Sequence, residues 1–365
     1  MRGYFMTKLR AGIIGATGMV GQRFITLLAD HPMFTIEVLA ASSRSAGKRY
    51  GDLMESKWAM KTEIPANIAD MVVMDASEVE AVAAKVDFVF CAVDMDKKAI
   101  VELEEAYAKA EVPVVSNNSA NRWTPDVPMI IPEINWRHAE VIEAQRQRLG
   151  TKRGFIACKP NCSIQSYVPA LNALMEFEPT QVSVCTYQAI SGAGKTFDTW
   201  PDILDNVIPY IGGEEEKSEQ EPLRIWGSVV DGKIVPATSP VISAQCLRVP
   251  ASDGHMAAVS VNFKNKPTKE QILKAWAEYK ALPQEANLPH APAQFLTYME
   301  EDNRPQTKLD RDIYGGMGIT IGRLREDDLF DYKFVCLSHN TLRGAAGGAV
   351  LTAELLTERG YITAK

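Results

Sequence analysis

Residues 9–28, LRAGIIGATGMVGQRFITLL, decide the fold that we predict for this chain. The apolar run Leu9–Ile14 predicts a buried strand, and Met19–Leu28 predicts a helix directly after the turn that follows. Three glycines, beginning with Gly15, are spaced G-x-x-G-x-x-G rather than G-x-G-x-x-G. Such glycines let the backbone approach a pyrophosphate, and the free N–H groups of the helix start can bind its oxygens. The stretch predicts a dinucleotide-binding unit, although a tight turn without a ligand would show the same glycines.

The next hundred residues continue the alternation of strands and helices. Thr35–Ala40, Met71–Met74, Val86–Val93 and Val112–Ser116 are predicted strands, and Lys97–Ala110 is a predicted helix before the last of them. Strands separated by helical crossovers favour parallel pairing with right-handed connections. The first half therefore predicts an α/β fold with a Rossmann-type, doubly wound parallel sheet.

The second half of the chain has a different pattern. Val182–Gln188, Ala257–Phe263 and Phe334–Ser338 alternate apolar and polar residues, which is typical of strands with one buried face. We expect an α+β domain with a mixed or largely antiparallel sheet, one face of which is a contact surface. The charged run Gly213–Glu221 predicts a solvated helix start or loop, and Arg137–Leu149 predicts a polar helix.

The length of 365 residues favours two domains. We expect residues 1–156 to form the dinucleotide-binding domain, completed by a C-terminal helix within residues 340–365. Residues 157–339 are expected to form the second domain.

The composition excludes several classes of protein. Lys and Arg total 39 against 46 Asp and Glu, so the net charge of −7 favours neither nucleic acid nor an anionic membrane as partner. We find no run of about 18 apolar residues and no secretory leader, so we expect no membrane span. Six scattered cysteines are typical of a reduced, cytoplasmic protein rather than a disulfide framework.

The residues after the second predicted strand indicate which dinucleotide is bound. An NAD site usually places an acidic residue there for the ribose 2′-hydroxyl. This chain instead has Ser42, Ser43, Arg44 and Ser45, followed by Lys48. Hydroxyls and cations without an acid suit a 2′-phosphate, so we predict NADP. A solvated basic turn is the alternative.

A cysteine near the middle of the chain, in KPNCSIQS (Lys159–Ser166), is a possible nucleophile. Pro160 and Asn161 suit a helix start, which would place Cys162 in the first turn, where N–H groups and the helix dipole favour a thiolate. A zinc site would need further ligands at local spacing, and none accompanies Cys158 and Cys162. A buried structural thiol remains an equally good reading of the position alone.

A cysteine nucleophile needs a partner that moves protons, and histidine is the usual one. His255 follows a turn signal, Asp253-Gly254, and begins an alternating strand, so it is predicted at a sheet edge. A capping or core histidine would fit the same position. His138 lies in the polar helix and is expected at the surface.

Five motifs occur in the order found in one family. They are the glycine turn from Gly15, the Asn161-Cys162 pair, QAISGAG from Gln188, RVPASDGH ending at His255, and NTLRGAAGG from Asn340. Together they resemble aspartate-semialdehyde dehydrogenases over nearly the whole chain. ASSRSAGKRYGD, DVPMIIPEIN and GGMGITIGR make the resemblance closer to the archaeal and fungal branch.

The resemblance implies specific roles for residues of the second domain. Cys162 matches the nucleophile, His255 the acid/base and Gln188 the residue that orients the acyl intermediate. Arg248 matches the arginine that holds the substrate carboxylate, a bidentate task suited to guanidinium. Glu214 matches the acid that meets the substrate ammonium group.

The resemblance also implies phosphate and cofactor sites, whereas the missing ligand spacing around Cys162 already predicts no metal. Arg122 and Lys217 match cations that bind inorganic phosphate. The residues expected to bind NADP are Gly15, Thr17, Gly18, Met19, Val20, Ser42, Ser43, Arg44, Ser45, Ser191, Gly192 and Asn340.

The implied activity is that of an NADP-dependent oxidoreductase. It would reductively dephosphorylate aspartyl phosphate to aspartate semialdehyde, reversibly and through a cysteine thioester. The reaction would serve lysine, methionine, threonine and diaminopimelate biosynthesis in a homodimer or homotetramer, with residues 157–339 as the catalytic and dimerisation domain. A malonyl-CoA reductase and a non-catalytic NADP-binding regulator are the alternatives. One departure is Lys159, where the family pattern has Asn, and its role stays open.

Overall fold

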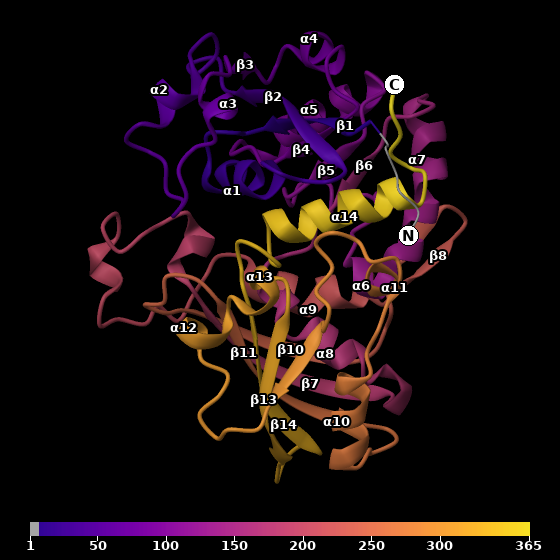
Figure 1. Cartoon of the computed structure of the whole chain (residues 1–365). Coiled ribbons are helices and arrows are strands. Elements are labelled where there is room, and N and C mark those ends of the chain that lie inside the picture. Colours follow the sequence, from indigo (N-terminus) through magenta and orange to yellow (C-terminus); the bar gives the residue numbers. More distant parts are fainter. Residues whose placement is uncertain (1–6) are drawn as a thin grey trace.

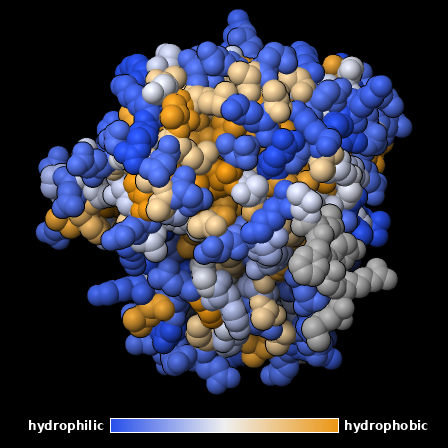
Figure 2. All heavy atoms as spheres, turned by 45° about the horizontal axis from the view of Figure 1, so that its top comes forward, coloured by the Kyte–Doolittle hydropathy of each residue, from blue (hydrophilic) through white to orange (hydrophobic). Residues whose placement is uncertain are grey.

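The computed structural model describes residues 7–365, so the first six residues of the predicted 1–156 domain lie outside it. The chain forms two sheet-based units, one from the N-terminal half and one from the C-terminal half, with helix α14 (Ala346–Glu358) between them (Figure 1). On the face in Figure 2 polar side chains predominate, and apolar side chains gather mainly in the upper part of the view. None of the helices in residues 7–365 has both the length and the apolar character needed to span a membrane.

The first unit is built on a parallel sheet of strand order β3-β2-β1-β4-β5-β6. The strands are β1 (Leu9–Ile14), β2 (Phe34–Ala41), β3 (Met74–Asp75), β4 (Phe88–Cys91), β5 (Val114–Ser116) and β6 (Ile156–Cys158). The helices are α1 (Met19–Leu28), α2 (Tyr50–Met54), α3 (Ala66–Ala69), α4 (Val79–Ala83), α5 (Lys97–Lys109), α6 (Pro132–Asn135) and α7 (Ile142–Leu149). The reversal of strand order on either side of β1 confirms the predicted doubly wound sheet.

Two local predictions in this unit were wrong in part. The strand predicted at Met71–Met74 is only the two-residue β3, because the chain before it runs through turns. The polar helix predicted from Arg137 is a 3₁₀ helix over Trp136–Val141, and α-helix begins only at Ile142. His138 lies on the 3₁₀ helix and is buried rather than exposed, because its ring nitrogens bond to Asn135 and to the Gly227 carbonyl.

The second unit has a mixed sheet of strand order β10-β7-β11-β14-β13-β12, as predicted for this half. Its strands are β7 (Pro179–Gln188), β10 (Val241–Arg248), β11 (His255–Phe263), β12 (Leu296–Met299), β13 (Ile319–Glu326) and β14 (Tyr332–Ser338). Its helices are α8 (Val168–Asn172), α9 (Glu214–Ile225), α10 (Lys269–Ala277), α11 (Leu282–Glu285), α12 (Thr307–Asp310) and α13 (Ile313–Gly316), and β8 (Ser228–Val230) pairs with β9 (Lys233–Val235). Side chains of β7 and β10 alternate between buried and exposed, so one face of the sheet is open.

The charged run at Gly213–Glu221 forms the predicted helix start, but one face of it is buried rather than solvated. It begins helix α9, and Ser218 and Glu221 are buried in its interior face. These polar side chains can be buried because they form hydrogen bonds with groups inside the molecule.

A buried cluster of hydrogen bonds joins the end of α1 to α14 and to the loop after α11. Oε1 of Glu354 lies 2.8 Å from His31 Nε2 and 2.6 Å from His290 Nδ1. These three residues place possible metal ligands within 4.8 Å of one another. However, His31 Nδ1 accepts the N–H groups of Met33 and Phe34, so its proton is on Nε2 and faces the carboxylate. A metal would have to displace that proton, so the cluster acts as a hydrogen-bonded link.

A second buried link holds the segment before α14 against α6. The guanidinium of Arg343 donates to both carboxylate oxygens of Glu133, at 2.9 and 2.6 Å, and both side chains are fully buried. Arg343 also donates to the Met317 carbonyl and lies over the Phe295 ring. The pair therefore ties both units to the C-terminal segment.

We expect Arg343→Met to lower the free energy of unfolding by about 3–5 kcal/mol, because the Glu133 carboxylate would stay buried without its partner. Urea unfolding measures this. The matched control is Asp70→Asn, which removes an ion pair of Arg49 at the surface and should cost less than about 1 kcal/mol. An Arg343→Met variant as stable as the control would contradict the assignment.

Candidate active site and cofactor pocket

A cavity of about 510 Å³ lies at the carboxyl ends of β1 to β4, where a doubly wound sheet binds its ligand. Gly15 has φ +94°, and a Cβ there would lie 2.4 Å from the Ala92 carbonyl oxygen. A Cβ on Gly21 would lie 2.4 Å from the Gly15 carbonyl oxygen, so α1 packs directly on the turn. The first and third glycines are therefore required by close backbone approach.

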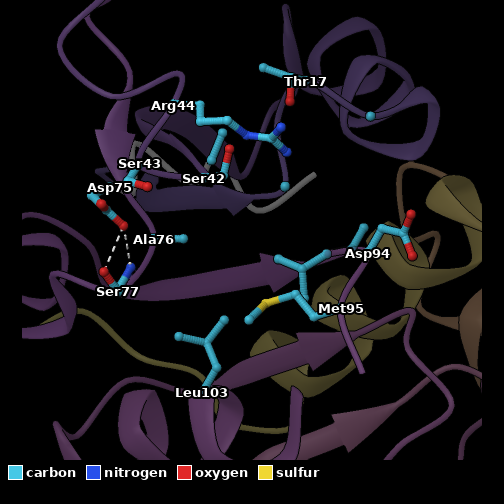
Figure 3. A pocket seen from close by; sticks show the side chains of 15 residues that line it. Thr17, Ser42, Ser43, Arg44, Asp75, Ala76, Ser77, Asp94, Met95 and Leu103 are labelled. Atoms are coloured by element: carbon cyan, nitrogen blue, oxygen red, sulfur yellow. Dashed lines mark hydrogen bonds between the residues drawn. The ribbon is translucent and has the colours of Figure 1, made fainter. Parts of the chain in front are cut away.

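The polar rim of this cavity comes from the segment after β2 and from β3 (Figure 3). Arg44 is exposed and extends past Ser42 toward Thr17. The Asp75 carboxylate is hydrogen-bonded within its own turn, since its Oδ1 accepts the N–H and the hydroxyl of Ser77 at 2.9 and 2.7 Å. The predicted cofactor residues that line the cavity are Gly15, Thr17, Gly18, Ser42, Ser43 and Arg44.

A second cavity, of about 290 Å³, contains the cysteine. The site residues predicted from sequence that line it are Cys162, Glu214, Arg122, Lys217, Val20, Ser191, Gly192 and Asn340. Asn340 donates to Ser191 Oγ at 2.9 Å and accepts the Gly254 N–H at 2.8 Å. It thereby links two loops at the cavity. Met19 and Ser45 line neither cavity.

Cys162 follows β6 through a short turn rather than starting an α-helix. Asn161 caps this turn, because its Oδ1 accepts the N–H and the hydroxyl of Ser163, both at 2.7 Å. The helical segment after Cys162 is only a 3₁₀ turn over Ser163–Gln165, and α8 begins at Val168. Asn161 therefore forms the predicted cap, but no long helix follows whose dipole would act on Cys162.

The surroundings of Cys162 do not favour the thiolate as we had expected. Burial raises the pKa of the Cys162 thiol, and the Glu214 carboxylate raises it further. The cations of Lys159, Arg122 and Arg248 oppose this shift without reversing it. The thiol must therefore lose its proton to a nearby group when it reacts.

Glu214 stands in the first turn of α9, beside the cysteine loop. Its two carboxylate oxygens accept from Asn161 Nδ2, both at 3.0 Å. They also accept from Gln188 Nε2 at 3.1 Å and from Lys217 Nζ at 2.8 Å. Glu214 therefore binds the side-chain amides of Asn161 and Gln188, which come from two other segments, and the ammonium group of Lys217 on its own helix.

Glu221, two turns further along α9, makes the corresponding link to Arg122. Its Oε1 accepts from Arg122 Nη1 at 2.8 Å, and its Oε2 accepts the Asn161 N–H at 2.6 Å. One buried carboxylate thus fixes both a cation of the cavity and the residue before the cysteine. Sequence reasoning missed Glu221, although its spacing of seven from Glu214 would place both on one helix face.

Three predicted residues lie close together where three neighbouring strands of the second sheet begin or end. Gln188 ends β7, Arg248 ends the parallel strand β10 in register with it, and His255 begins the antiparallel strand β11. Arg248 Nη1 donates to the Ala189 carbonyl at 2.7 Å. A Cβ on Gly192 would lie 3.1 Å from both Arg248 Nη1 and His255 Nε2, so this loop covers the two side chains closely.

His255 is held as a neutral ring with a defined tautomer. Its Nδ1 accepts the Ala189 N–H at 3.0 Å, which leaves the proton on Nε2. Burial and then the Arg248 cation lower the pKa of His255 to about 3. The imidazole can therefore offer a hydrogen from Nε2.

The chain matches two family models, one for each sheet-based unit. Residues 10–142 match the NAD binding domain of semialdehyde dehydrogenases, and residues 171–343 match the semialdehyde dehydrogenase dimerisation domain. Among solved structures, aspartate semialdehyde dehydrogenase with NADP from Candida albicans superposes with a TM-score of 0.87 at 39% identity, covering 98% of this chain and 100% of that one.

Two curated relatives extend over the same length. The aspartate-semialdehyde dehydrogenase of Schizosaccharomyces pombe is 43% identical, covering 98% of this chain and 100% of the relative. The enzyme of the same name from Methanothermobacter thermautotrophicus is 42% identical, covering 96% of this chain and 99% of the relative. With this similarity over nearly its whole length, the chain belongs to the aspartate-semialdehyde dehydrogenase family.

Proposed function

We propose that this chain oxidises aspartate semialdehyde to aspartyl phosphate with NADP⁺ and phosphate, and runs the reverse reduction in amino-acid biosynthesis, with Cys162 as nucleophile. One observation supports it most strongly. The cavity that contains Cys162 is also lined by Arg122, Glu214 and Lys217, two cations and an acid. A malonyl-CoA substrate has no ammonium group to use Glu214, so this set favours an amino-acid substrate.

The first cavity fits the chemistry of NADP. Gly15 leaves a backbone cradle that any Cβ would close, and the exposed Arg44 offers a fork of donors for a 2′-phosphate. NADP⁺, when bound, accepts the hydride of the reaction. Val20, Ser191, Gly192 and Asn340 line the cysteine cavity, and we assign them to the reactive end of the cofactor.

The substrate groups are assigned by charge. Arg248 would bind the carboxylate with the guanidinium edge that the Ala189 carbonyl leaves free, and Glu214 would meet the ammonium group. Phosphate would bind to Arg122 and Lys217. Gln188, anchored by Glu214, would hold the carbonyl oxygen of the acyl group.

Cys162 Sγ would add to the aldehyde carbon, and the carbonyl oxygen would take up negative charge. His255 carries a hydrogen on Nε2, so we assign it the acid/base role: it donates that hydrogen to the oxygen as the thiol proton of Cys162 passes to the ring. Loss of the hydride and of the hydroxyl proton gives the thioester, and phosphate oxygen then displaces Sγ.

We further propose that the open face of β7 and β10 pairs with a second copy, in a dimer or tetramer. Alternating exposed side chains on these strands support a sheet-face contact. All six cysteines are free thiols, which supports a reducing, cytoplasmic compartment. We also propose the domain boundary after β6, with α14 completing the first unit against α1.

The variant Cys162→Ser is expected to bind NADP but to lose ~10³-fold or more in rate, as removal of a catalytic nucleophile does. The assay is phosphate-dependent reduction of NADP⁺ with aspartate semialdehyde, repeated with malonyl-CoA and NADPH. Cys185→Ser, on the open face of β7, is the matched control and should keep its activity. Retained activity in Cys162→Ser would refute the assignment.

We expect Arg44→Ala to weaken NADP binding by about 10- to 100-fold, the loss of one or two charge-assisted hydrogen bonds. Fluorescence titration with NADPH and with NADH measures this. NADH serves as the internal control, because it has no 2′-phosphate and its affinity should not fall. An equal loss for both dinucleotides would show that Arg44 has a different role.

A further inference from the structure

Glu104 is a buried carboxylate of the first unit that takes no part in the reaction steps proposed above. It stands on α5 and is fully buried. Its Oε1 accepts from the Ser116 hydroxyl and, at 3.2 Å, from Asn118 Nδ2, while its Oε2 accepts from Asn121 Nδ2 at 2.8 Å. Within residues 7–365 it forms no ion pair with a cation. A carboxylate buried in this way depends on its hydrogen-bond donors, and losing one of them is costly.

The three donors belong to one continuous segment. Ser116 ends β5, and Asn118 and Asn121 lie in the loop that follows it, residues 117–122. The Asn118 N–H also donates to Ser116 Oγ at 3.0 Å. Burial raises the pKa of the Glu104 carboxyl, and the hydrogen bonds from these donors oppose that shift. Glu104 therefore holds the 117–122 loop both where it leaves the strand and near its other end.

The same loop lines the cavity that contains the nucleophile. Asn117, Ser119 and Arg122 contribute to its wall. Arg122 directly follows Asn121, and its guanidinium is fixed from two sides. Its Nη1 donates to Glu221 at 2.8 Å, and its Nη2 donates to the Asn117 carbonyl at 3.2 Å. The position of this cation therefore depends on the shape of the loop.

The loop also carries polar groups that are ready for a ligand. Nε of Arg122 and both side-chain amide atoms of Asn117 are buried, and none has a hydrogen-bond partner in the described part of the chain. Such unpaired groups are rare in proteins, so each calls for an explanation. A guanidinium N–H together with an amide, which offers both a donor and an acceptor, suits an oxyanion that carries a proton, such as hydrogenphosphate.

We infer that Glu104 is a positioning residue for the phosphate co-substrate. It holds the 117–122 loop so that Arg122 and Asn117 present their free groups to the anion, and it does not touch the phosphate itself. The inference rests on the proposed function, in which Arg122 binds phosphate. It adds to that function the residue that sets the affinity for phosphate and the orientation in which phosphate attacks the thioester.

The experiment compares the wild-type protein with Glu104→Gln. Glutamine keeps the shape but turns one acceptor oxygen into a donor, which would face the donors of the loop. The burst of NADPH without phosphate reports thioester formation, and the dependence of turnover on phosphate concentration reports the second step. We expect kcat/KM for phosphate to fall about 10- to 100-fold, the range for one or two charge-assisted hydrogen bonds. The burst rate and the KM for aspartate semialdehyde should keep their wild-type values.

A second variant tests the same link from the other side. Asn121→Ala removes the donor next to Arg122 and should cause the same selective loss. The double variant should lose no more than either single one, because both side chains act through one contact. Glu354→Gln is the matched control, since it changes an equally buried, hydrogen-bonded carboxylate that lines neither cavity. It should keep the wild-type dependence on phosphate even where its thermal stability falls.

Two results would overturn the inference. One is a wild-type dependence on phosphate in Glu104→Gln or in Asn121→Ala. The other is a burst rate or an NADP affinity that falls as much as kcat/KM for phosphate, which would indicate a general loss of structure. If Glu104→Gln does not fold, Asn121→Ala decides alone. A wild-type protein whose thioester is not discharged by phosphate would refute the proposed function instead, before any variant is made.

Discussion

The buried acidic face of α9 is the constraint on which the catalytic cavity depends. Glu221 accepts from Arg122 and from the Asn161 N–H, while Glu214 accepts from the Asn161 amide, Gln188 and Lys217. Two carboxylates on one helix thereby hold together Arg122 of the first unit, Asn161 beside the cysteine, Gln188 at the end of β7, and Lys217 of α9 itself. Buried charges of this kind are stable only when paired, so losing either partner leaves an uncompensated ion.

The fold could be predicted well where the hydrophobic pattern is strong. Leu9–Leu28 became β1, the glycine turn and α1 at the predicted residues, since each local preference agrees with burial of the same face. The short β3 and the 3₁₀ helix around His138 were not predictable to this detail. Their form depends on contacts with segments remote in sequence, such as the Gly227 carbonyl.

The residues of the site could be predicted from the sequence, but their protonation states could not. The motifs identified Cys162, Gln188, Arg248 and His255, and the sheet topology explains why the last three converge. The protonation states depend on burial and partners that a sequence does not contain. The Cys162 thiol has a raised pKa where a helix start suggested a lowered one, and the His255 tautomer follows from a single backbone N–H of Ala189. Glu221 acquires its role only through such three-dimensional contacts, with Arg122 and the Asn161 N–H.

The central claim is that the substrate becomes bound to Cys162 as a thioester. The most direct measurement is mass spectrometry of the protein mixed with aspartate semialdehyde and NADP⁺ in the absence of phosphate. The account predicts an aspartyl adduct on the peptide containing Cys162, which disappears when phosphate is added. Turnover with no adduct, or an adduct on another residue that phosphate discharges, would contradict it.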